Sequence, residues 1–260
     1  MKLSFSTRGW GDLSWDTYVE TALEMKFTGI EVYNLFKFPA LTEKGGPFHA
    51  HRLAATIRNL RDKKLCIPCL DTSLDLSAAE DLSATVRQTL EYARDLQVPY
   101  VVVWASQGEE ADLEALRSRI TALLPLAEEL GVCILLKTSG IFADTGRLRR
   151  FLEDYASDWL GALWDMHHPY RDYGESADTT IKNLGTYVRH VHLRDSDSDG
   201  SYNLIGEGTL PVSDMMRALS SINYDGFISL EWKPEWMEDL QDREIIFPHF
   251  VKLFIGSIII

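Results

Sequence analysis

Short apolar runs alternate with longer amphipathic segments along the whole chain. A short apolar run bounded by Gly, Pro or polar residues is typical of a strand. The run Val98–Trp104 is apolar at nearly every position, as in strands that are buried on both faces. The sequence predicts eight strands, over Lys2–Ser6, Gly29–Tyr33, Lys64–Leu70, Val98–Trp104, Val132–Leu136, Ala162–Trp164, Val188–Leu193 and Phe227–Leu230.

The segments between these runs repeat apolar residues at helical spacing. Ser14 or Asp16 is expected to cap the first helix, and Gly131 follows another at the position where glycine often ends helices. The predicted helices run from Ser14 to about Met25 and over Phe48–Lys63, Ala79–Leu96, Ala111–Leu130, Thr145–Tyr155, Ser176–Gly185, Pro211–Ser221 and Arg243–Phe254.

Strict alternation of strand and helix predicts a parallel sheet with right-handed crossovers. The length of 260 residues suits one (β/α)8 TIM barrel, which typically needs about 250 residues, and eight units favour closure over an open sheet. No G-x-G-x-x-G follows the first strand, so a dinucleotide fold and a nucleotide cofactor are not expected. No linker divides the chain, and residues 1–260 are predicted to form a single domain.

The net charge and the first residues of the chain indicate which partners and which cellular location to expect. The formal net charge is −13, from 39 acidic and 26 basic residues, and such a surface repels nucleic acid and anionic membranes. Met1–Ser4 leads directly into polar sequence, so neither a signal peptide nor a membrane span is expected. The predicted location is therefore cytoplasmic.

Two local features have a structural and a functional interpretation. Cys66 and Cys69 form a C-x-x-C, but redox pairs of this kind lie at a helix N-terminus, whereas this segment has the pattern of a strand. The structural interpretation is favoured. The apolar end Phe254–Ile260 indicates either a domain of a longer fused protein or a segment docked on a partner, such as a second copy. Ile258–Ile260 is expected to be packed in either case.

Polar chemistry concentrates in the strand Val188–Leu193 and the residues after it. Alternation along a strand places His190, His192 and Arg194 on one face with Val188. These side chains are costly to bury and have no packing use, so the plain alternative is a half-exposed strand with a solvated face.

Neighbouring apolar runs also end in carboxylate or imidazole groups, at Asp165 with His168 and at Glu231. Packing alone does not explain three successive runs of this kind. In a TIM barrel the chemistry lies at the C-terminal rim of the strands. The residues at the predicted strand ends are Arg8, Glu31, Asp71, Trp104, Lys137, Asp165, His168, His192, Arg194 and Glu231.

Several of these rim residues have a structural alternative. Glu31 can form an ion pair with an arginine, Asp71 can cap the loop that follows it, and Trp104 can belong to the core or the pocket wall. Of His167 and His168, at most one is expected to face the centre.

The combination of Asp165, His192 and Glu231 has a clear chemical meaning. Carboxylates and imidazole suit a divalent metal such as Mn²⁺, Mg²⁺, Co²⁺ or Zn²⁺. Such an ion binds neighbouring oxygens of a sugar and polarises a carbonyl. Flanking bases can then move a proton between adjacent carbons.

Four motifs carry a resemblance to a known family. They are Asp165–His168 (Asp-x-x-His), His190–Asp195 (His-Val-His-Leu-Arg-Asp), Ile205–Gly208 (Ile-Gly-Glu-Gly) and Ile228–Trp232 (Ile-Ser-Leu-Glu-Trp). The chain resembles the sugar phosphate isomerase/epimerase family of the xylose isomerase-like TIM barrel superfamily. That superfamily also includes keto-sugar 3-epimerases, inosose dehydratases and endonuclease IV. The resemblance implies carbohydrate metabolism and a small-molecule sugar or sugar-phosphate substrate.

The resemblance also assigns roles. It implies one metal held by a Glu on the fifth strand and by the residues that match Asp165, His192 and Glu231 here. The fifth-strand Glu is also one of the two catalytic bases in the family's epimerases. His168 and Arg194 match positions that contact substrate, and the rim residues Glu31 and Trp104 are expected to contribute to the same substrate site.

Lys137 stands where the resemblance predicts the fifth-strand Glu. Three carboxylates with a divalent ion sum to about −1, and two carboxylates with one ammonium give the same sum without a metal. Lys137 can therefore replace the metal. It can also act as a base with a depressed pKa, form a Schiff base, or plug an inactive barrel as a salt bridge.

Two function classes follow from these observations. The first is an isomerase or epimerase that works by enolisation next to a carbonyl, with Lys137 and Glu231 as catalytic residues. The alternative is a catalytically inactive barrel that serves as a ligand-binding or scaffolding domain of a larger protein. An endonuclease IV-like DNA-repair activity is disfavoured, because the chain has only 7 His and no basic groove.

Overall fold

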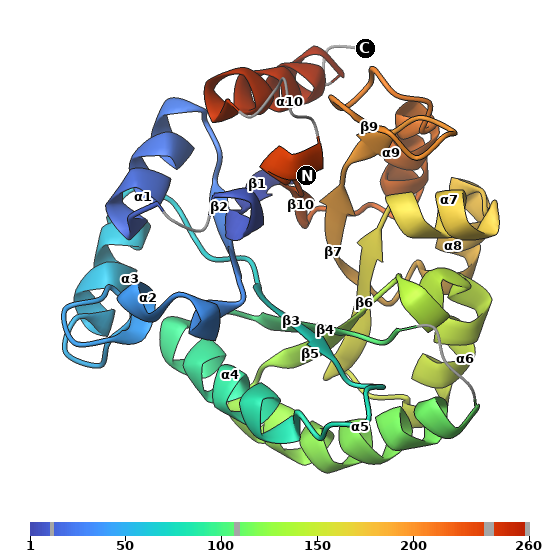
Figure 1. Cartoon of the computed structure of the whole chain (residues 1–260), viewed down its shortest axis with the longest axis horizontal. Coiled ribbons are helices and arrows are strands. Elements are labelled where there is room, and N and C mark those ends of the chain that lie inside the picture. Colours follow the sequence, from blue (N-terminus) through green and yellow to red (C-terminus); the bar gives the residue numbers. More distant parts are fainter. Residues whose placement is uncertain (11–12, 107–109, 237–241, 258–260) are drawn as a thin grey trace.

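A computed structural model of the chain describes residues 1–10, 13–106, 110–236 and 242–257. Within these ranges, eight parallel strands close into a barrel in the order β1-β10-β7-β6-β5-β4-β3-β2, as Figure 1 shows. The predicted single (β/α)8 TIM barrel is confirmed. The barrel strands are β1 (Lys2–Ser6), β2 (Gly29–Tyr33), β3 (Leu70–Asp75), β4 (Tyr100–Trp104), β5 (Cys133–Lys137), β6 (Leu160–Asp165), β7 (Val188–Leu193) and β10 (Phe227–Leu230).

The long helices surround the barrel (Figure 1). They are α1 (Trp15–Glu24), α3 (Leu53–Asp62), α4 (Ser83–Leu96), α5 (Glu110–Leu130), α6 (Thr145–Tyr155), α8 (Ala177–Leu184), α9 (Val212–Ser221) and α10 (Arg243–Ser257). Local signals explain several helix ends. Ser14 caps α1 by accepting a hydrogen bond from the Thr17 amide, and Gly131 follows α5 with a φ of +66°.

Shorter elements, which the sequence did not predict, occupy the connections between strands and helices. They are a small antiparallel pair, β8 (Asp195–Ser196) with β9 (Tyr202–Asn203), the helices α2 (Pro39–Thr42) and α7 (His167–Tyr173), and the 3₁₀ turns η1 (Thr7–Gly9), η2 (Leu35–Lys37), η3 (Gly140–Ala143) and η4 (Pro234–Trp236).

The third strand corrects the sequence prediction. Lys64–Leu70 was expected to be the strand and Asp71-Thr72-Ser73 a loop, but β3 spans Leu70–Asp75. Pro68 has no amide hydrogen, so it interrupts the ladder, and the earlier part forms only an isolated bridge between Cys66 and Gly29. The predicted helices at Phe48–Lys63 and Ala79–Leu96 are also too long, since α3 and α4 begin later.

A buried apolar layer forms the floor beneath the site. It consists of Cys69, Val102, Cys133, Leu135 and Leu163. Because side chains alternate along a strand, the residues two positions after Cys69, Val102, Leu135 and Leu163 project from the same face of their strands. Those residues are Asp71, Trp104, Lys137 and Asp165.

Cys66 and Cys69 are free thiols, and Cys69 belongs to this floor. The apolar tail Ile258–Ile260 lies outside the described residues, so its expected packing stays a prediction. No helix in the described ranges is long and apolar enough to cross a membrane.

Candidate active site

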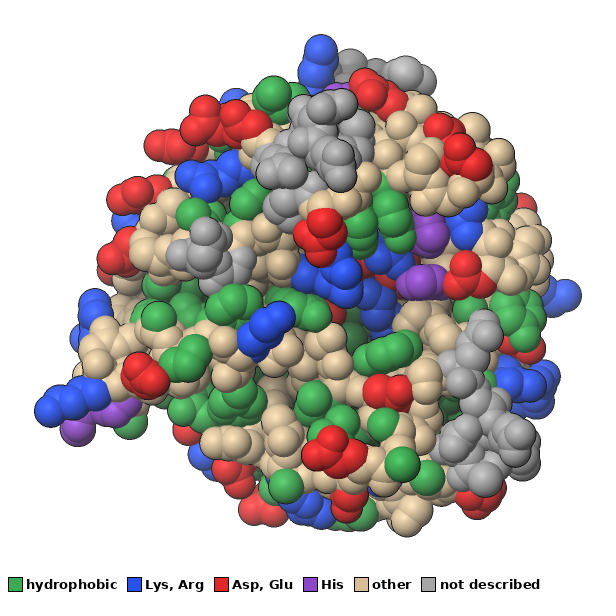
Figure 2. Space-filling model, viewed as in Figure 1, with side chains coloured by type: hydrophobic (Ala, Val, Ile, Leu, Met, Phe, Trp, Pro, Cys, Tyr) green, Lys and Arg blue, Asp and Glu red, His purple; other side chains and the backbone are tan. Residues whose placement is uncertain are grey.

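A cavity of about 310 Å³ opens at the C-terminal ends of the strands, above the apolar floor. Figure 2 shows Lys, Arg and His side chains gathered around the hollow centre of this face. The charged and imidazole side chains that line the cavity are Arg8, Asp71, Lys137, His168, Arg194 and Lys233. Tyr33, Trp104, Tyr202 and Trp236 form its aromatic walls.

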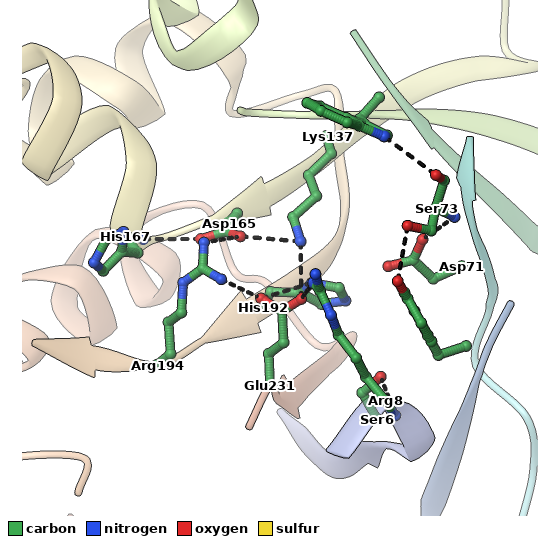
Figure 3. A network of polar contacts seen from close by, with 12 residues as sticks. Ser6, Arg8, Asp71, Ser73, Lys137, Asp165, His167, His192, Arg194 and Glu231 are labelled. Atoms are coloured by element: carbon green, nitrogen blue, oxygen red, sulfur yellow. Dashed lines mark hydrogen bonds and ion pairs between the residues drawn. The ribbon is translucent and has the colours of Figure 1, made fainter. Parts of the chain in front are cut away.

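Lys137 lies between two fully buried carboxylates (Figure 3). Its Nζ is 3.1 Å from Asp165 Oδ2 and 3.1 Å from Glu231 Oε1. Burial alone would lower the pKa of Lys137, but Glu231 and Asp165 outweigh it and raise that pKa above its ordinary value. Lys137 is therefore an ammonium group at neutral pH. The sequence-based alternatives of a base or a Schiff-base nucleophile need a depressed pKa, so this environment disfavours them.

Arg194 joins the same two carboxylates. Its Nη1 donates to Glu231 Oε2 at 2.8 Å, and its Nη2 donates to Asp165 Oδ2 at 3.0 Å. Arg8 adds an ion pair with Glu231 Oε1. Burial would raise the pKa of Asp165 and of Glu231, but the surrounding cations hold both well below their usual range. Two carboxylates thus face three cations.

His168 faces the site and His167 faces away, as expected. An arginine can only donate, so His168 Nε2 accepts a hydrogen bond from Arg194, and the Nδ1–H donates to Asp172 Oδ2 at 2.7 Å. His167 instead pairs through Nε2 with Ser196 Oγ at 3.0 Å. The Asp172 carboxylate therefore orients the imidazole that supports Arg194.

The inward face of β7 is buried, so the solvated-face alternative is wrong, and His190, His192 and Arg194 lie together as predicted. Val188 does not share their face, because a register shift after it pairs it with Ala162 on the outward side of the barrel. His190 and His192 each donate from Nε2 to the same atom, Glu31 Oε2, at 2.8 Å. Two imidazoles, instead of the arginine considered above, thus hold Glu31. Glu31, Asp165, His192 and Glu231 are all fully buried, and none of the four lines the cavity. His192 Nδ1 lies 3.9 Å from Glu231 Oε2.

Asp71 and Trp104 lie on the opposite wall. Asp71 Oδ1 accepts a hydrogen bond from the Ser73 amide at 2.8 Å, so it caps the local turn and also lines the cavity. Burial raises the pKa of Asp71, and Glu31 adds to that rise, while Lys137 opposes it. Trp104 forms the pocket wall, where its Nε1 donates to the Ser73 carbonyl at 3.3 Å.

Four of the pocket residues named above were not predicted from the sequence, Tyr33 at the end of β2 and Tyr202, Lys233 and Trp236 in the connections after β7 and β10. Tyr202 and Trp236 stack with ring centroids 4.1 Å apart and an interplanar angle of 11°. Lys233 Nζ lies 5.6 Å from the centroid of the Trp236 ring. The only sequence signal for Lys233 was its place two residues after Glu231 at the rim.

Asp195 explains the Ile-Gly-Glu-Gly motif. Its Oδ2 accepts hydrogen bonds from the amides of Gly206 at 2.8 Å and Gly208 at 3.1 Å. Its Oδ1 accepts from Ser196 at 2.8 Å and Leu210 at 3.2 Å. A Cβ on Gly208 would lie 2.4 Å from Asp195 Oδ1, so only glycine fits. One buried carboxylate thus holds the loop that follows β9.

A divalent metal does not fit the predicted ligand set. Lys137 occupies the space between Asp165 and Glu231, and Arg194 spans the same carboxylates. These two carboxylates and the cations Lys137, Arg194 and Arg8 already sum to about +1. A divalent ion would add two further positive charges, each repelled by roughly 4 kcal/mol per neighbouring cation at ~4 Å.

Two other groups of described residues bring metal-ligand atoms within 4.8 Å of one another, Glu31-His190-His192 and Asp71-His192-Glu231. In the first, the carboxylate oxygen already accepts two imidazole N–H groups. The second uses Glu231, which the three cations already neutralise. The Nε2 atoms of both histidines and Glu31 Oε2 thus bind one another, whereas Glu31 Oε1 and the Nδ1 atoms of His190 and His192 have no hydrogen-bond partner among the described residues.

Comparison with known proteins identifies the relatives of the chain. An uncharacterised protein of Methanocaldococcus jannaschii is 29% identical over 164 residues, which is 57% of this chain and 55% of that protein. The fructoselysine 3-epimerase of Escherichia coli O157:H7 is 22% identical over 165 residues, covering 59% of this chain and 60% of the enzyme. The chain thus matches a little over half the length of these relatives.

Solved structures agree on the fold. The 3-keto-D-glucoside 4-epimerase of E. coli has a TM-score of 0.78 at 13% identity, covering 99% of each chain. An L-ribulose 3-epimerase has a TM-score of 0.80 at 18% identity, covering 98% of this chain and 93% of that one. The family model described as xylose isomerase-like TIM barrel matches residues 19–246. The chain belongs to the xylose isomerase-like TIM barrel family.

Proposed function

We propose that the chain is an isomerase- or epimerase-like enzyme that moves a proton at a carbon next to the carbonyl of a small sugar or sugar phosphate in the cytoplasm. The observation that carries this proposal is the ammonium of Lys137, which is held by two buried carboxylates at one cavity. Membership of a family whose relatives include fructoselysine 3-epimerase supports it.

Enolisation needs a base for the carbon-bound proton and a positive group at the carbonyl oxygen, where negative charge develops. Lys137 has the second property, since its raised pKa keeps it charged and it borders the cavity. In the proposed reaction its N–H donates to the carbonyl oxygen. The ammonium thereby stabilises the enolate that forms when the adjacent carbon loses its proton.

Proton transfer is assigned to two carboxyl groups whose environments shift their pKa values in opposite directions. The lowered pKa of Glu231 keeps it ionised, and we assign it to accept the proton from carbon. Glu231 is fully buried behind Arg8, Lys137 and Arg194, so the substrate must displace these cations to reach it. The raised pKa of Asp71 brings it closer to neutrality, so it is the group that returns a proton. Pairs of carboxyl groups whose pKa values are pushed apart often divide the acid and base roles in this way.

The remaining pocket residues are assigned to positioning. Arg194, supported by His168, orients substrate oxygens, and the ring of Trp104 packs against the apolar face of the substrate. Glu31 Oε2 is held by His190 and His192, so we assign Glu31 a role through His192 instead of the direct substrate contact expected from the sequence.

The test is exchange of a carbon-bound hydrogen in deuterated water. A panel of keto- and aldo-sugars and their phosphates is incubated with the protein, and deuterium next to the carbonyl is measured by mass spectrometry. We expect at least one substrate to exchange. Glu231→Gln should slow exchange by about 100-fold or more, in the range of general acid–base contributions.

Glu235→Gln is the matched control, because Glu235 is an exposed carboxylate on the neighbouring turn η4 and should leave the rate unchanged. Binding of a panel sugar without exchange would contradict the proposal. That result would support the ligand-binding alternative.

A further inference from the structure

We propose that Lys137 is an internal substitute for the divalent cation of the four-ligand centre, so that this centre works without a metal and one substitution would create a metal site. The inference concerns binding alone and does not depend on which reaction the enzyme catalyses. Its basis is the position of Lys137 and the charges around it.

The position of Lys137 is that of a bridging cation. Its Nζ lies 3.1 Å from one oxygen of Asp165, at the end of β6, and 3.1 Å from one oxygen of Glu231, directly after β10. An ammonium is a compact charge with three donors. The ammonium donates a hydrogen bond to Glu231 and forms an ion pair with Asp165, so a third N–H can be directed to the side where Lys137 borders the cavity.

That third donor gives Lys137 one further property of a metal centre. A catalytic metal keeps a position open for the substrate oxygen, and its positive charge stabilises that oxygen. The cavity-facing N–H offers a comparable contact, as a hydrogen bond instead of a coordinate bond. Lys137 can thus take over the electrostatic role of the ion.

Charge balance explains why Lys137 and a divalent metal ion cannot both occupy this centre. Asp165 and Glu231 contribute about −2, and Lys137, Arg194 and Arg8 contribute about +3. Replacing Lys137 with glutamate gives three carboxylates against two guanidinium groups, a sum of about −1. The same change supplies the missing fifth-strand carboxylate, beside the unpaired Nδ1 of His192.

The experiment is calorimetric titration with MnCl₂ of protein that was stripped of metal with a chelator. The wild-type protein is expected to bind Mn²⁺ weakly, and Lys137→Glu at least about tenfold more tightly, because two charge units change at the ion's position. Thermal melting of each variant checks that the fold is retained.

Lys233→Glu is the matched control. Lys233 lines the same cavity, and among the described residues no carboxylate lies within ion-pair distance of it. The substitution changes the charge equally, but not between Asp165 and Glu231, so Mn²⁺ affinity should stay within about threefold of wild type. Lys137→Gln provides a second variant, which adds a neutral oxygen ligand and should bind with intermediate affinity.

The outcomes separate the alternatives. A gain confined to the Lys137 variants supports the proposal. Tight Mn²⁺ binding by the wild-type protein, equal gains in Lys137→Glu and Lys233→Glu, or no gain in either folded Lys137 variant would overturn it. Failure of the deuterium-exchange test would leave these binding results unaffected, so the two proposals can fail separately.

Discussion

Lys137 shows how a buried charge is tolerated in this barrel. Removing an ammonium from water is costly, and only close opposite charges with good geometry offset that cost. Asp165 and Glu231 supply those charges at 3.1 Å each. The same two contacts give the residue its charge state and its position at the cavity, so stability and the proposed function depend on one arrangement.

Substituting Lys137 should therefore destabilise the fold. Lys137→Met leaves two buried carboxylates with fewer partners, and we expect the free energy of unfolding to fall by about 2–3 kcal/mol. Arg194 still contacts both carboxylates, which keeps the loss at the lower end of the range for broken buried ion pairs. Urea denaturation measures the change. Lys233→Met, at the same cavity, should cost less than about 1 kcal/mol, and equal losses would show that the ion pairs of Lys137 contribute little.

The contribution of Lys137 should have a specific pH dependence. Its pKa in the folded protein is raised above the ordinary value of 10.5, so the stabilisation is fully present below that value and is lost as pH rises through the folded pKa. The difference in unfolding free energy between wild type and Lys137→Met should stay constant from about pH 7 to pH 10. A difference that already declines between about pH 7 and pH 9 would contradict a charged Lys137.

At the scale of secondary-structure elements, the apolar pattern predicted the bounds of those elements whose ends are determined by burial alone. The pattern predicted Val188–Leu193 and Phe227–Leu230 with correct bounds, because alternation or continuous apolarity directly reports burial. It misplaced β3, where a proline interrupts an apolar run and the ladder resumes over polar residues. It also missed β9 and η4, which carry Tyr202 and Trp236, since elements of two or three residues show no apolar period and depend on contacts with other segments.

Asp195 is the clearest example of such a long-range contact, and its removal should loosen the loop after β9. In Asp195→Ala, four backbone amides lose their acceptor. Amide hydrogen exchange at Gly206, Gly208 and Leu210 should accelerate by at least about tenfold, and the protein should lose about 1–3 kcal/mol of stability. Asp199→Ala, which removes only a local turn contact, is the control. Unchanged protection in Asp195→Ala would mean that other contacts hold this loop.

At the scale of the whole molecule, barrel closure brings together residues that are far apart in the sequence. The rim rule predicted that Glu31, Lys137, Asp165, His192 and Glu231 share one mouth, because each lies at the C-terminal end of a parallel strand. The five side chains meet in one network of contacts, but of these five only Lys137 lines the cavity. The charge sum, in which the Lys137 ammonium replaces the metal ion, predicted that Lys137 pairs with Asp165 and Glu231. The sequence did not reveal that Glu31 serves both β7 histidines or that Arg8 and Arg194 also bind Glu231, since these contacts depend on side-chain reach across the barrel.

The charge distribution of the molecule predicts a preference for anionic substrates. The chain carries a formal net charge of −13, yet Arg8, Lys137, Arg194 and Lys233 line the cavity (Figure 2). A sugar phosphate should bind at least about tenfold more tightly than the unphosphorylated sugar, and added salt should reduce the difference. Lys233→Ala should weaken phosphate-sugar binding selectively, whereas Lys63→Ala, an exposed lysine at the end of α3, should not. Equal binding of both sugars in low salt would contradict this prediction.

The central claim is that Lys137 is a charged ammonium held by Asp165 and Glu231. Nitrogen-15 NMR of the lysine side chains tests it most directly, with Lys137→Met identifying the signal. The account predicts that the Lys137 nitrogen keeps its ammonium chemical shift at pH 7 and titrates above the ordinary lysine value of 10.5. A titration below about pH 7 would make Lys137 mainly a neutral amine at physiological pH, as a base or Schiff-base former requires, and would contradict the account.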